Sequence, residues 1–330
     1  LNNKNILITG GTGSFGKKCT EIILQRYKPR RLIIFSRDEL KQFEMAQQFS
    51  HSKYDCIRYF IGDIRDKERL HRAFSNLDYV IHAAALKQVP AAEYNPFEAV
   101  KTNILGSQNV INVAIDQGVK KVIALSTDKA ANPINLYGAT KLCSDKLFVA
   151  ANNMVGEQDT RFSVVRYGNV VGTRGSVVPF FEKLIKDKTD HLPITHPEMT
   201  RFWITLQEGV NFVLKNFERM LGGEIFIPKI PSMRVVDLAT SMAPALEQRE
   251  VGIRPGEKLH EIMCPQDDSH LTLEFEDHFV ITPSIHYTSA GNRFTPNKIG
   301  EEGQPVKQGY EYNSGTNPEF LTVEALKTYR

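Results

Sequence analysis

The sequence predicts a doubly wound α/β fold, in which a parallel sheet is covered by helices on both faces. Short, continuous apolar runs alternate with helical patterns through the first half of the chain, which is typical of parallel sheets. A glycine-rich turn follows the first of these runs directly. The chain has 330 residues, which suits one such Rossmann unit and a smaller C-terminal lobe.

Six apolar runs are expected to be strands of this sheet. Each run is short and continuous rather than alternating, as expected of strands buried on both faces. After the sixth run the regular alternation fades, and Pro, Thr and charged residues interrupt shorter elements. In chain order the runs cover residues 5–9, 31–35, 56–61, 79–82, 121–125 and 162–166.

Composition and charge argue against several classes of protein. Lys and Arg number 41 and Asp and Glu 38, which gives a net charge of +3 without long single-sign runs, so nucleic acid is not an expected partner. Four scattered cysteines predict neither a metal site nor a disulfide framework, and they suit a reducing cytoplasm. No run approaches the roughly 20 apolar residues of a spanning helix, so no membrane partner is expected either.

The turn after the first strand reads Gly11-x-Gly13-x-x-Gly16, with Gly10 ahead of it, and it opens a helix. Glycines in this place let the backbone approach a pyrophosphate, which then meets the positive end of the helix. Glycine also collects in ordinary turns and where helices pack closely. The position directly after an N-terminal strand favours a dinucleotide cofactor.

The end of the second strand bears on which dinucleotide is bound. Ser36, Arg37 and Lys41 suit the 2′-phosphate of NADP, whereas Asp38 suits the ribose hydroxyls and leaves NAD open. The alternative is that Arg37 and Asp38 only pair on the surface. Later strand ends add candidate cofactor contacts for which turn and packing roles are equally open, namely Asp63, Ile64, Ala83 and Ala85.

Two sets of candidate catalytic residues lie on or just before the helix expected over residues 133–151. Tyr137 and Lys141 lie on one helix face, and Lys141 would favour the phenolate of a side chain whose free pKa is about 10. The alternative is a buried Tyr beside a solvated Lys. Just before the helix, Thr127 can hydrogen-bond a reacting hydroxyl, and the adjacent Asp128 and Lys129 offer a proton donor and acceptor unless they form a surface ion pair.

These segments resemble those of the extended short-chain dehydrogenases that act on nucleotide sugars. Within that family the resemblance is to the inverting UDP-N-acetylglucosamine 4,6-dehydratases of pseudaminic acid biosynthesis, which serve flagellin glycosylation. Lys129 discriminates among relatives, because dehydratases of plain nucleotide-glucose carry an acidic residue there. The resemblance covers nearly the whole chain and rests on residues 10–16, 36–41, 126–141, 166–172, 199–205 and 254–261.

The resemblance implies a lyase with NADP as cofactor. Tyr137 would take the proton of the sugar O4 hydroxyl as hydride leaves C4, and the resulting ketone acidifies the C5 proton. Lys129, if neutral, would remove that proton, while Asp128, if protonated, would donate to the departing C6 hydroxyl. Hydride returns to C6 and C5 is reprotonated from the opposite face. The product would be UDP-2-acetamido-2,6-dideoxy-β-L-arabino-hex-4-ulose.

The resemblance also implies contacts to the ligands. Lys87 and Asn169 would meet the sugar or phosphates, Arg201 and Arg254 the pyrophosphate, and Glu257 a ribose or base hydroxyl. For each of these residues a capped turn or a surface salt bridge is the alternative. Further implied cofactor contacts are Thr12, Ser14, Phe15, Lys87, Tyr137 and Lys141, and further implied substrate contacts are Val170, Arg174 and Thr195.

The chain is expected to divide into three parts. Residues 1–166 would form the NADP-binding domain, and residues 167–264 mainly a substrate-binding lobe with some segments returning to the first domain. Residues 265–330 would be a C-terminal extension on the surface that ends in a helical pattern over 321–329. Apolar Leu142, Leu147, Phe148 and Val149 on the helix predict a homo-oligomer, a dimer or larger.

Two other functions stay open at this point. The first is a nucleotide-sugar 4-epimerase or reductase on the same scaffold, although 4-epimerases do not need the acid and base at Asp128 and Lys129. The second is a nonenzymatic NADP-sensing protein, since fold alone does not fix function.

Overall fold

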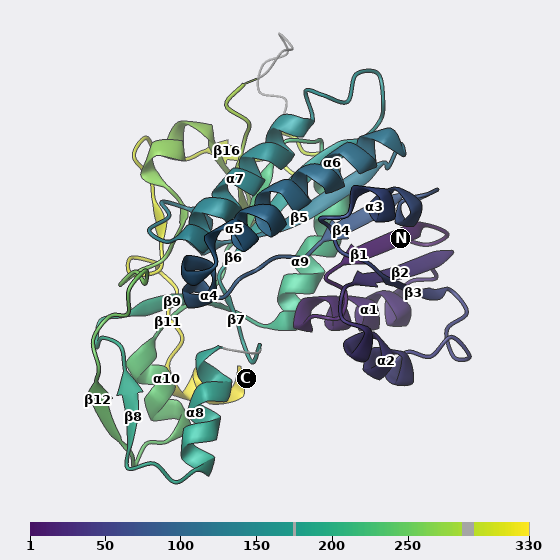
Figure 1. Ribbon diagram of the computed structural model, residues 1–330. Helices are drawn as coiled ribbons and strands as arrows, with labels where there is room; N and C mark the ends of the chain where they lie inside the picture. The colour runs from purple at the N-terminus through teal and green to yellow at the C-terminus, as the bar shows by residue number, and fades with distance from the viewer. Residues whose placement is uncertain (174–175, 286–293, 330) are drawn as a thin grey trace.

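The computed structural model describes residues 1–173, 176–285 and 294–329 and has the predicted doubly wound α/β fold (Figure 1). Within these ranges the central sheet has the strand order β16-β14-β15-β10-β6-β5-β4-β1-β2-β3. The strands from β3 to β10 in this order run parallel, and the order reverses direction at β1. Sheets of this kind bind ligands at the carboxyl ends of the strands, beside that reversal.

The six predicted strands are confirmed, with shifts of at most two residues at their ends. The run 79–82 is reproduced without change because Asp78 ahead of it and the alanines behind it are not part of the ladder. A seventh parallel strand, β10 (Ile225–Pro228), joins the sheet beside β6. The six are β1 (Asn5–Thr9), β2 (Arg31–Ser36), β3 (Ile57–Ile61), β4 (Tyr79–His82), β5 (Lys121–Thr127) and β6 (Arg161–Tyr167).

Helices cover both faces of this sheet. In Figure 1, α3, α6 and α7 lie together over one face, and α1 contacts α9 on the other. A π-helical turn, Lys101–Leu105, precedes α6, and a 3₁₀ turn, Asp128–Ala130, joins β5 to α7. The helices are α1 (Ser14–Arg26), α2 (Glu39–Gln48), α3 (Lys67–Ala73), α4 (Val89–Tyr94), α5 (Pro96–Val100), α6 (Gly106–Asp116), α7 (Leu136–Ala151) and α9 (Leu206–Arg219).

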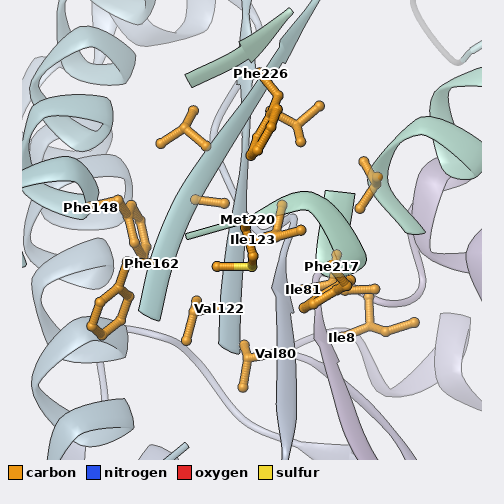
Figure 2. Close-up of a cluster of buried hydrophobic side chains, with 14 of the residues drawn as sticks. Ile8, Val80, Ile81, Val122, Ile123, Phe148, Phe162, Phe217, Met220 and Phe226 are labelled. Carbon is orange, nitrogen blue, oxygen red and sulfur yellow. The ribbon is translucent and has the colours of Figure 1, made fainter. Parts of the chain in front are cut away.

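The main core lies between the sheet and these helices (Figure 2). Phe148 of α7 is fully buried against Phe162 of β6, with their ring centroids 6.2 Å apart. Each such side chain contributes about 1.5–3 kcal/mol by leaving water. The expectation that Phe148 helps to form an exposed oligomer face is therefore wrong, and Leu147 and Val149 also pack against this core.

A smaller lobe with a core of its own follows β6, at the lower left of Figure 1. Its core includes Phe181, Leu192, Trp203 and Leu238, all at most 2% exposed. Its elements are β7 (Asn169–Val170), α8 (Val177–Lys186), β8 (His191–Ile194), β9 (Thr200–Ile204), β11 (Ser232–Arg234), α10 (Val235–Met242) and β12 (Glu247–Glu250).

The C-terminal segment does not lie only on the surface, contrary to expectation. β15 (His278–Ile281) pairs antiparallel with β10, β14 (Thr272–Glu274) adds to β15, and β16 (Gln304–Pro305) adds to β14. Phe275 and Phe279 enter the main core, and Leu326 of α11 (Val323–Thr328) enters the core of the smaller lobe. These strands have two to four residues and no long apolar run, which hides them in the sequence. The segment also forms β13 (Ile262–Cys264) and β17 (Tyr312–Asn313).

Candidate active site

The glycine turn forms a backbone cradle at the start of α1. Gly10 has a φ of 65°, and a Cβ there would lie 2.9 Å from the Cα of Ala84. A Cβ on Gly16 would collide with the backbone of Gly11, so the helix starts in close contact with the turn. Gly13 is the N-cap and gives the helix no side-chain capping bond. The open amides at this helix end fit the pyrophosphate of a dinucleotide.

Other residues expected to contact the cofactor surround this cradle. The amide of Ala83 donates to the Thr9 hydroxyl at 3.1 Å, which holds the end of β4 beside the turn. Ala85 is half-buried in the same segment. Thr12 is buried, whereas Ser14 and Phe15 are half-buried at the start of α1.

The end of β2 places Arg37 and Asp38 differently. Asp38 caps α2, accepting from the Lys41 amide at 3.0 Å, and the Lys41 ammonium lies 2.6 Å from its other oxygen. Arg37 is 52% exposed and lies 3.4 Å from Asp63. The carboxylate of Asp38 thus serves the helix, while the guanidinium of Arg37 stays accessible. Ser36 is buried and accepts from Gln42 at 3.2 Å.

The contacts of Asp63 and Ile64 favour structural roles. Asp63 accepts from the amide and the guanidinium of Arg65, and these bonds hold its pKa below the usual range although partial burial opposes them. Ile64 is buried and packs against Gly106, where a Cβ would lie 2.7 Å from its Cδ1. The side chain of Ile64 is therefore a core group.

The 3₁₀ turn after β5 brings three expected catalytic groups together. The Thr127 hydroxyl donates to Asp128 Oδ1 at 2.8 Å, and Lys129 Nζ donates to the same oxygen at 3.1 Å. Asp128 is fully buried, and within the described chain its Oδ2 has no hydrogen-bond partner. The alternative of a surface ion pair does not apply to a carboxylate in this position.

Tyr137 lies in the first turn of α7, close to this group. Asn135 caps the helix by accepting from the Gly138 amide at 2.7 Å. Burial raises the pKa of Tyr137 to about 12, although the positive charge of Lys129 and a hydrogen bond with Thr127 oppose this increase. At neutral pH these side chains alone leave Tyr137 as a phenol, so a further positive charge is needed for it to act as a base.

Lys141 is buried one helical turn after Tyr137. Its ammonium donates to the Leu125 carbonyl at 2.8 Å. Burial lowers the pKa of Lys141, and the nearby Asp145 opposes this decrease. The cation with the larger effect on the Tyr137 phenol is Lys129 rather than Lys141.

Glu261 is a charged neighbour of Lys129 to which the sequence assigned no role. It is 2% exposed, and its Oε1 lies 3.2 Å from Lys129 Nζ and 3.8 Å from Arg201 Nε. Burial would lower the pKa of Lys129, but Asp128 and Glu261 outweigh it and raise this pKa above its ordinary value. The two carboxylates therefore favour the ammonium form of Lys129, whereas the role expected for Lys129 as a base requires the neutral amine. The only available signal was the inclusion of Glu261 at the end of the segment 254–261 that carried the resemblance.

The expected substrate-binding residues divide between the interior and the surface. Arg201 is buried and donates to the carbonyls of Thr200 and Leu259 at 2.7 and 3.2 Å. Arg254 is 73% exposed and forms an ion pair with Glu257 at 2.7 Å. The structure thus brings Arg201, but not Arg254, into contact with the Lys129 cluster.

The remaining candidates include one buried polar atom without a partner. Asn169 lies on β7 opposite Trp203, and within the described ranges its Oδ1 is buried and accepts no hydrogen bond. Lys87 is exposed after β4, and partial desolvation together with the charge of Lys129 lowers its pKa. Val170 and Thr195 are half-buried, and Arg174 lies outside the described residues.

Comparison with known proteins identifies close relatives. A family model described as polysaccharide biosynthesis protein matches residues 6–283. The chain is 65% identical over 326 residues to the UDP-N-acetylglucosamine 4,6-dehydratase (inverting) of Campylobacter jejuni subsp. jejuni serotype O:2, covering 99% of this chain and 97% of that protein. A protein of the same name from serotype O:23/36 is 63% identical, with the same coverage.

A solved structure has the same architecture. The X-ray structure of Pen from Bacillus thuringiensis is 39% identical to this chain, with a TM-score of 0.87 over 99% of this chain and 97% of that one. Among the described residues, no helix is both long enough and apolar enough to cross a bilayer. The resemblance inferred from the sequence is confirmed, and the chain belongs to the polysaccharide biosynthesis protein family with the fold of the extended short-chain dehydrogenases.

Proposed function

We propose that this protein is a UDP-N-acetylglucosamine 4,6-dehydratase that inverts C5. The observation that carries the proposal is the gathering of Thr127, Asp128, Lys129 and Tyr137 within one buried cluster, with Lys129 Nζ 3.1 Å from Asp128 Oδ1. Dehydration needs an acid and a base besides the group that handles the O4 proton. The identity of 65% to a protein of that name supports the same reaction.

Each step has a group in this cluster. Tyr137 accepts the O4 proton, and Thr127 orients the hydroxyl. NADP, held at the cradle formed by Gly10 and Gly16, would supply the hydride chemistry at C4 and C6. The ketone at C4 acidifies the C5 proton, which Lys129 removes while Asp128 protonates the departing C6 hydroxyl. Moving one proton along the existing hydrogen bond, from Lys129 Nζ to Asp128 Oδ1, produces the neutral amine and the carboxylic acid together.

NADP is the cofactor that the end of β2 favours. Arg37 is exposed and can form a bidentate contact with a 2′-phosphate. Asp38 is committed to the N-cap of α2 and to Lys41, which weakens the case for a carboxylate bound to the ribose of NAD. The cradle at Gly10 and Gly16 would hold the pyrophosphate.

For the substrate, we propose that Arg201 and Asn169 contact the sugar or the phosphates. Arg201 already faces the Lys129 cluster through Glu261, and Asn169 offers a buried acceptor without a partner in the described chain. Lys87 would add a positive charge beside the phosphates. Arg254 and Glu257 would reach the nucleotide only if their mutual ion pair opens.

The cellular setting is also part of the proposal. The four cysteines are free thiols, which fits a reducing cytoplasm. The product would enter pseudaminic acid biosynthesis and flagellin glycosylation. We further propose that the protein self-associates through the face formed by α4, α5 and the π-helical turn, where Tyr94, Phe97 and Leu105 are 88%, 76% and 47% exposed.

The direct test is turnover of UDP-N-acetylglucosamine with catalytic NADP⁺ in deuterated water, followed by NMR. Loss of one water with deuterium at C5 is expected, and the C5 couplings will report inversion or retention. A product that keeps its C6 hydroxyl would instead identify an epimerase or reductase. Binding of NADP without turnover of any nucleotide sugar would identify a sensing protein.

A further inference from the structure

Lys129 lies between two carboxylates that come from distant parts of the chain. Asp128 is its neighbour in sequence, whereas Glu261 comes from the segment before β13. The two carboxylate oxygens lie 3.1 and 3.2 Å from Nζ. The side chains of Asp128 and Glu261 are at most 2% exposed, whereas the side chain of Lys129 is 25% exposed. The amine is thus held in place from two sides, while the side chain as a whole is not fully buried.

The segment that carries Glu261 is fixed to the catalytic turn by further contacts. Asn135, the N-cap of α7, donates to the Gly256 carbonyl at 2.8 Å, and Lys258 donates to the Ala131 carbonyl at 2.5 Å. The Glu261 amide donates to the Ser314 hydroxyl at 2.8 Å. These bonds hold the backbone before Glu261 and at Glu261 itself, so its carboxylate has a defined position relative to Lys129.

We propose that Glu261 is a positioning residue for the elimination step, which holds Lys129 beside Asp128 and stabilises the ammonium that forms when Lys129 takes the C5 proton. This inference rests on the proposed function. The proton leaves C5 as the C6–O bond breaks, and Asp128 supplies the proton that releases water. Lys129 thereby returns to the ammonium form that Glu261 pairs with, so the negative charge of Glu261 favours the step in the direction of elimination.

The charged groups around Lys129 give Glu261 a role that Asp128 does not fill. Six neighbouring groups interact electrostatically with Lys129, namely Asp128, Glu261, Arg201, Lys87, Lys258 and Tyr137. Three of these groups are cations, which destabilise an ammonium at this place. Asp128 does not offset them throughout the reaction, because it stays neutral until it gives its proton to the departing hydroxyl. Glu261 then remains the only carboxylate within 4 Å of Lys129 among the described residues.

The first test measures the pKa of the Lys129 amine in the protein without substrate or cofactor. Limited acetylation with acetic anhydride over a range of pH, read by mass spectrometry, reports the fraction of neutral amine. In Glu261→Gln the pKa of Lys129 should fall, so that its labelling at a fixed pH rises about tenfold for each unit of decrease. Glu224→Gln is the matched control, because Glu224 is also 2% exposed but bonds to Ser163 at 2.6 Å. Equal labelling of Lys129 in all three proteins would overturn the proposal.

The second test separates elimination from binding. With UDP-N-acetylglucosamine and NADP⁺ in deuterated water, Glu261→Gln should lower kcat and the incorporation of deuterium at C5 by about 10²-fold or more, with little change in KM. Glu261→Asp keeps the charge and should restore part of both, and it serves as the informative variant if the glutamine variant fails to fold. A glutamine variant with the kcat of the control would contradict the positioning role. If the unmutated protein loses no water from this substrate, the dehydratase proposal fails, while the labelling test still decides whether Glu261 controls Lys129.

Discussion

Gly138 lies directly against the carbonyl of Lys129, and a Cβ at this position would collide with that oxygen. The first turn of α7 therefore packs on the 3₁₀ turn with no space for a side chain. This contact, together with the N-cap at Asn135, sets the distance between the Tyr137 phenol and the acid and base on the preceding turn.

Replacing Gly138 with Ala should displace the start of α7 from that turn. We expect a loss of about 1–3 kcal/mol in the free energy of unfolding, because overpacking forces a backbone shift. We also expect kcat to fall at least tenfold as Tyr137 moves away from Thr127. Urea unfolding and turnover assays measure the two effects. Ala139→Ser, at the adjacent exposed position, is the control and should change neither.

Asp128→Asn should remove the acid while preserving the shape of the side chain. We expect kcat to fall by about 10²–10⁴, because an amide cannot protonate the departing hydroxyl. Incorporation of deuterium at C5 should fall less than loss of water, since Lys129 remains in place. Both are read in one NMR experiment. A variant that eliminates water at the original rate would exclude Asp128 as the acid.

Arg37 and Asp38 should respond differently to substitution by Ala. Arg37→Ala should raise the KM for NADP⁺ about tenfold or more with little effect on NAD⁺, because a bidentate phosphate contact is lost. Asp38→Ala should leave the cofactor preference unchanged but destabilise α2 by about 1 kcal/mol, because its N-cap is lost. Steady-state kinetics with both cofactors and thermal unfolding distinguish the outcomes. A switch in preference in the Asp38 variant would favour NAD as the natural cofactor.

His82 should make the fold sensitive to acid. It is 1% exposed, its ring lies 2.8 Å from the Thr9 hydroxyl, and burial followed by the charge of Lys141 lowers its pKa to about 3. An unfolded His titrates near 6.5, so the neutral ring contributes its full stability above that pH and loses it as the pH falls toward 3.

Between pH 6.5 and 5 this linkage should remove about 2 kcal/mol from the free energy of unfolding. His82→Gln should be less stable at neutral pH but should show a smaller decrease over this interval. Urea titrations at the two pH values measure the difference. An equal decrease in both proteins would show that other groups, not His82, cause the acid sensitivity.

The proposed oligomer face can be tested at Phe97. Phe97→Asp places a charge on an exposed apolar side chain of α5 and should shift the protein toward the monomer in light scattering. Met154→Asp is the control, because Met154 is 63% exposed but lies beyond the end of α7. Identical molar masses for the two variants and the unmutated protein would argue against this face.

Local patterns account for the part of the fold that was predicted. The strands β1 and β4 were located to the residue because a buried parallel strand reads as an uninterrupted apolar run. The glycine turn and the residues 127–129 and 137 could also be found from the sequence, because each forms a motif of residues that are close together along the chain. Their placement at the carboxyl ends of the strands followed from the topology.

The failures concern contacts between distant segments. Glu261 meets Lys129 from a segment far along the chain, and no periodicity announces such a pair. The effect of that contact on the pKa of Lys129 was therefore missed as well. Phe148 was placed on the wrong surface because an apolar residue on a helix does not reveal whether a sheet or solvent faces it. The strands β14 and β15 are too short to produce a pattern of their own.

The antiparallel pairing of β15 with β10 has a consequence for how the chain matures on the ribosome. β10 ends at Pro228, and its outer edge is covered only after residues 278–281 have been made. Until then the growing polypeptide presents an apolar strand edge, of the kind that pairs with other chains. A nascent protein arrested between these two points should therefore depend on chaperones, and a chain truncated before β15 should aggregate where the full chain does not.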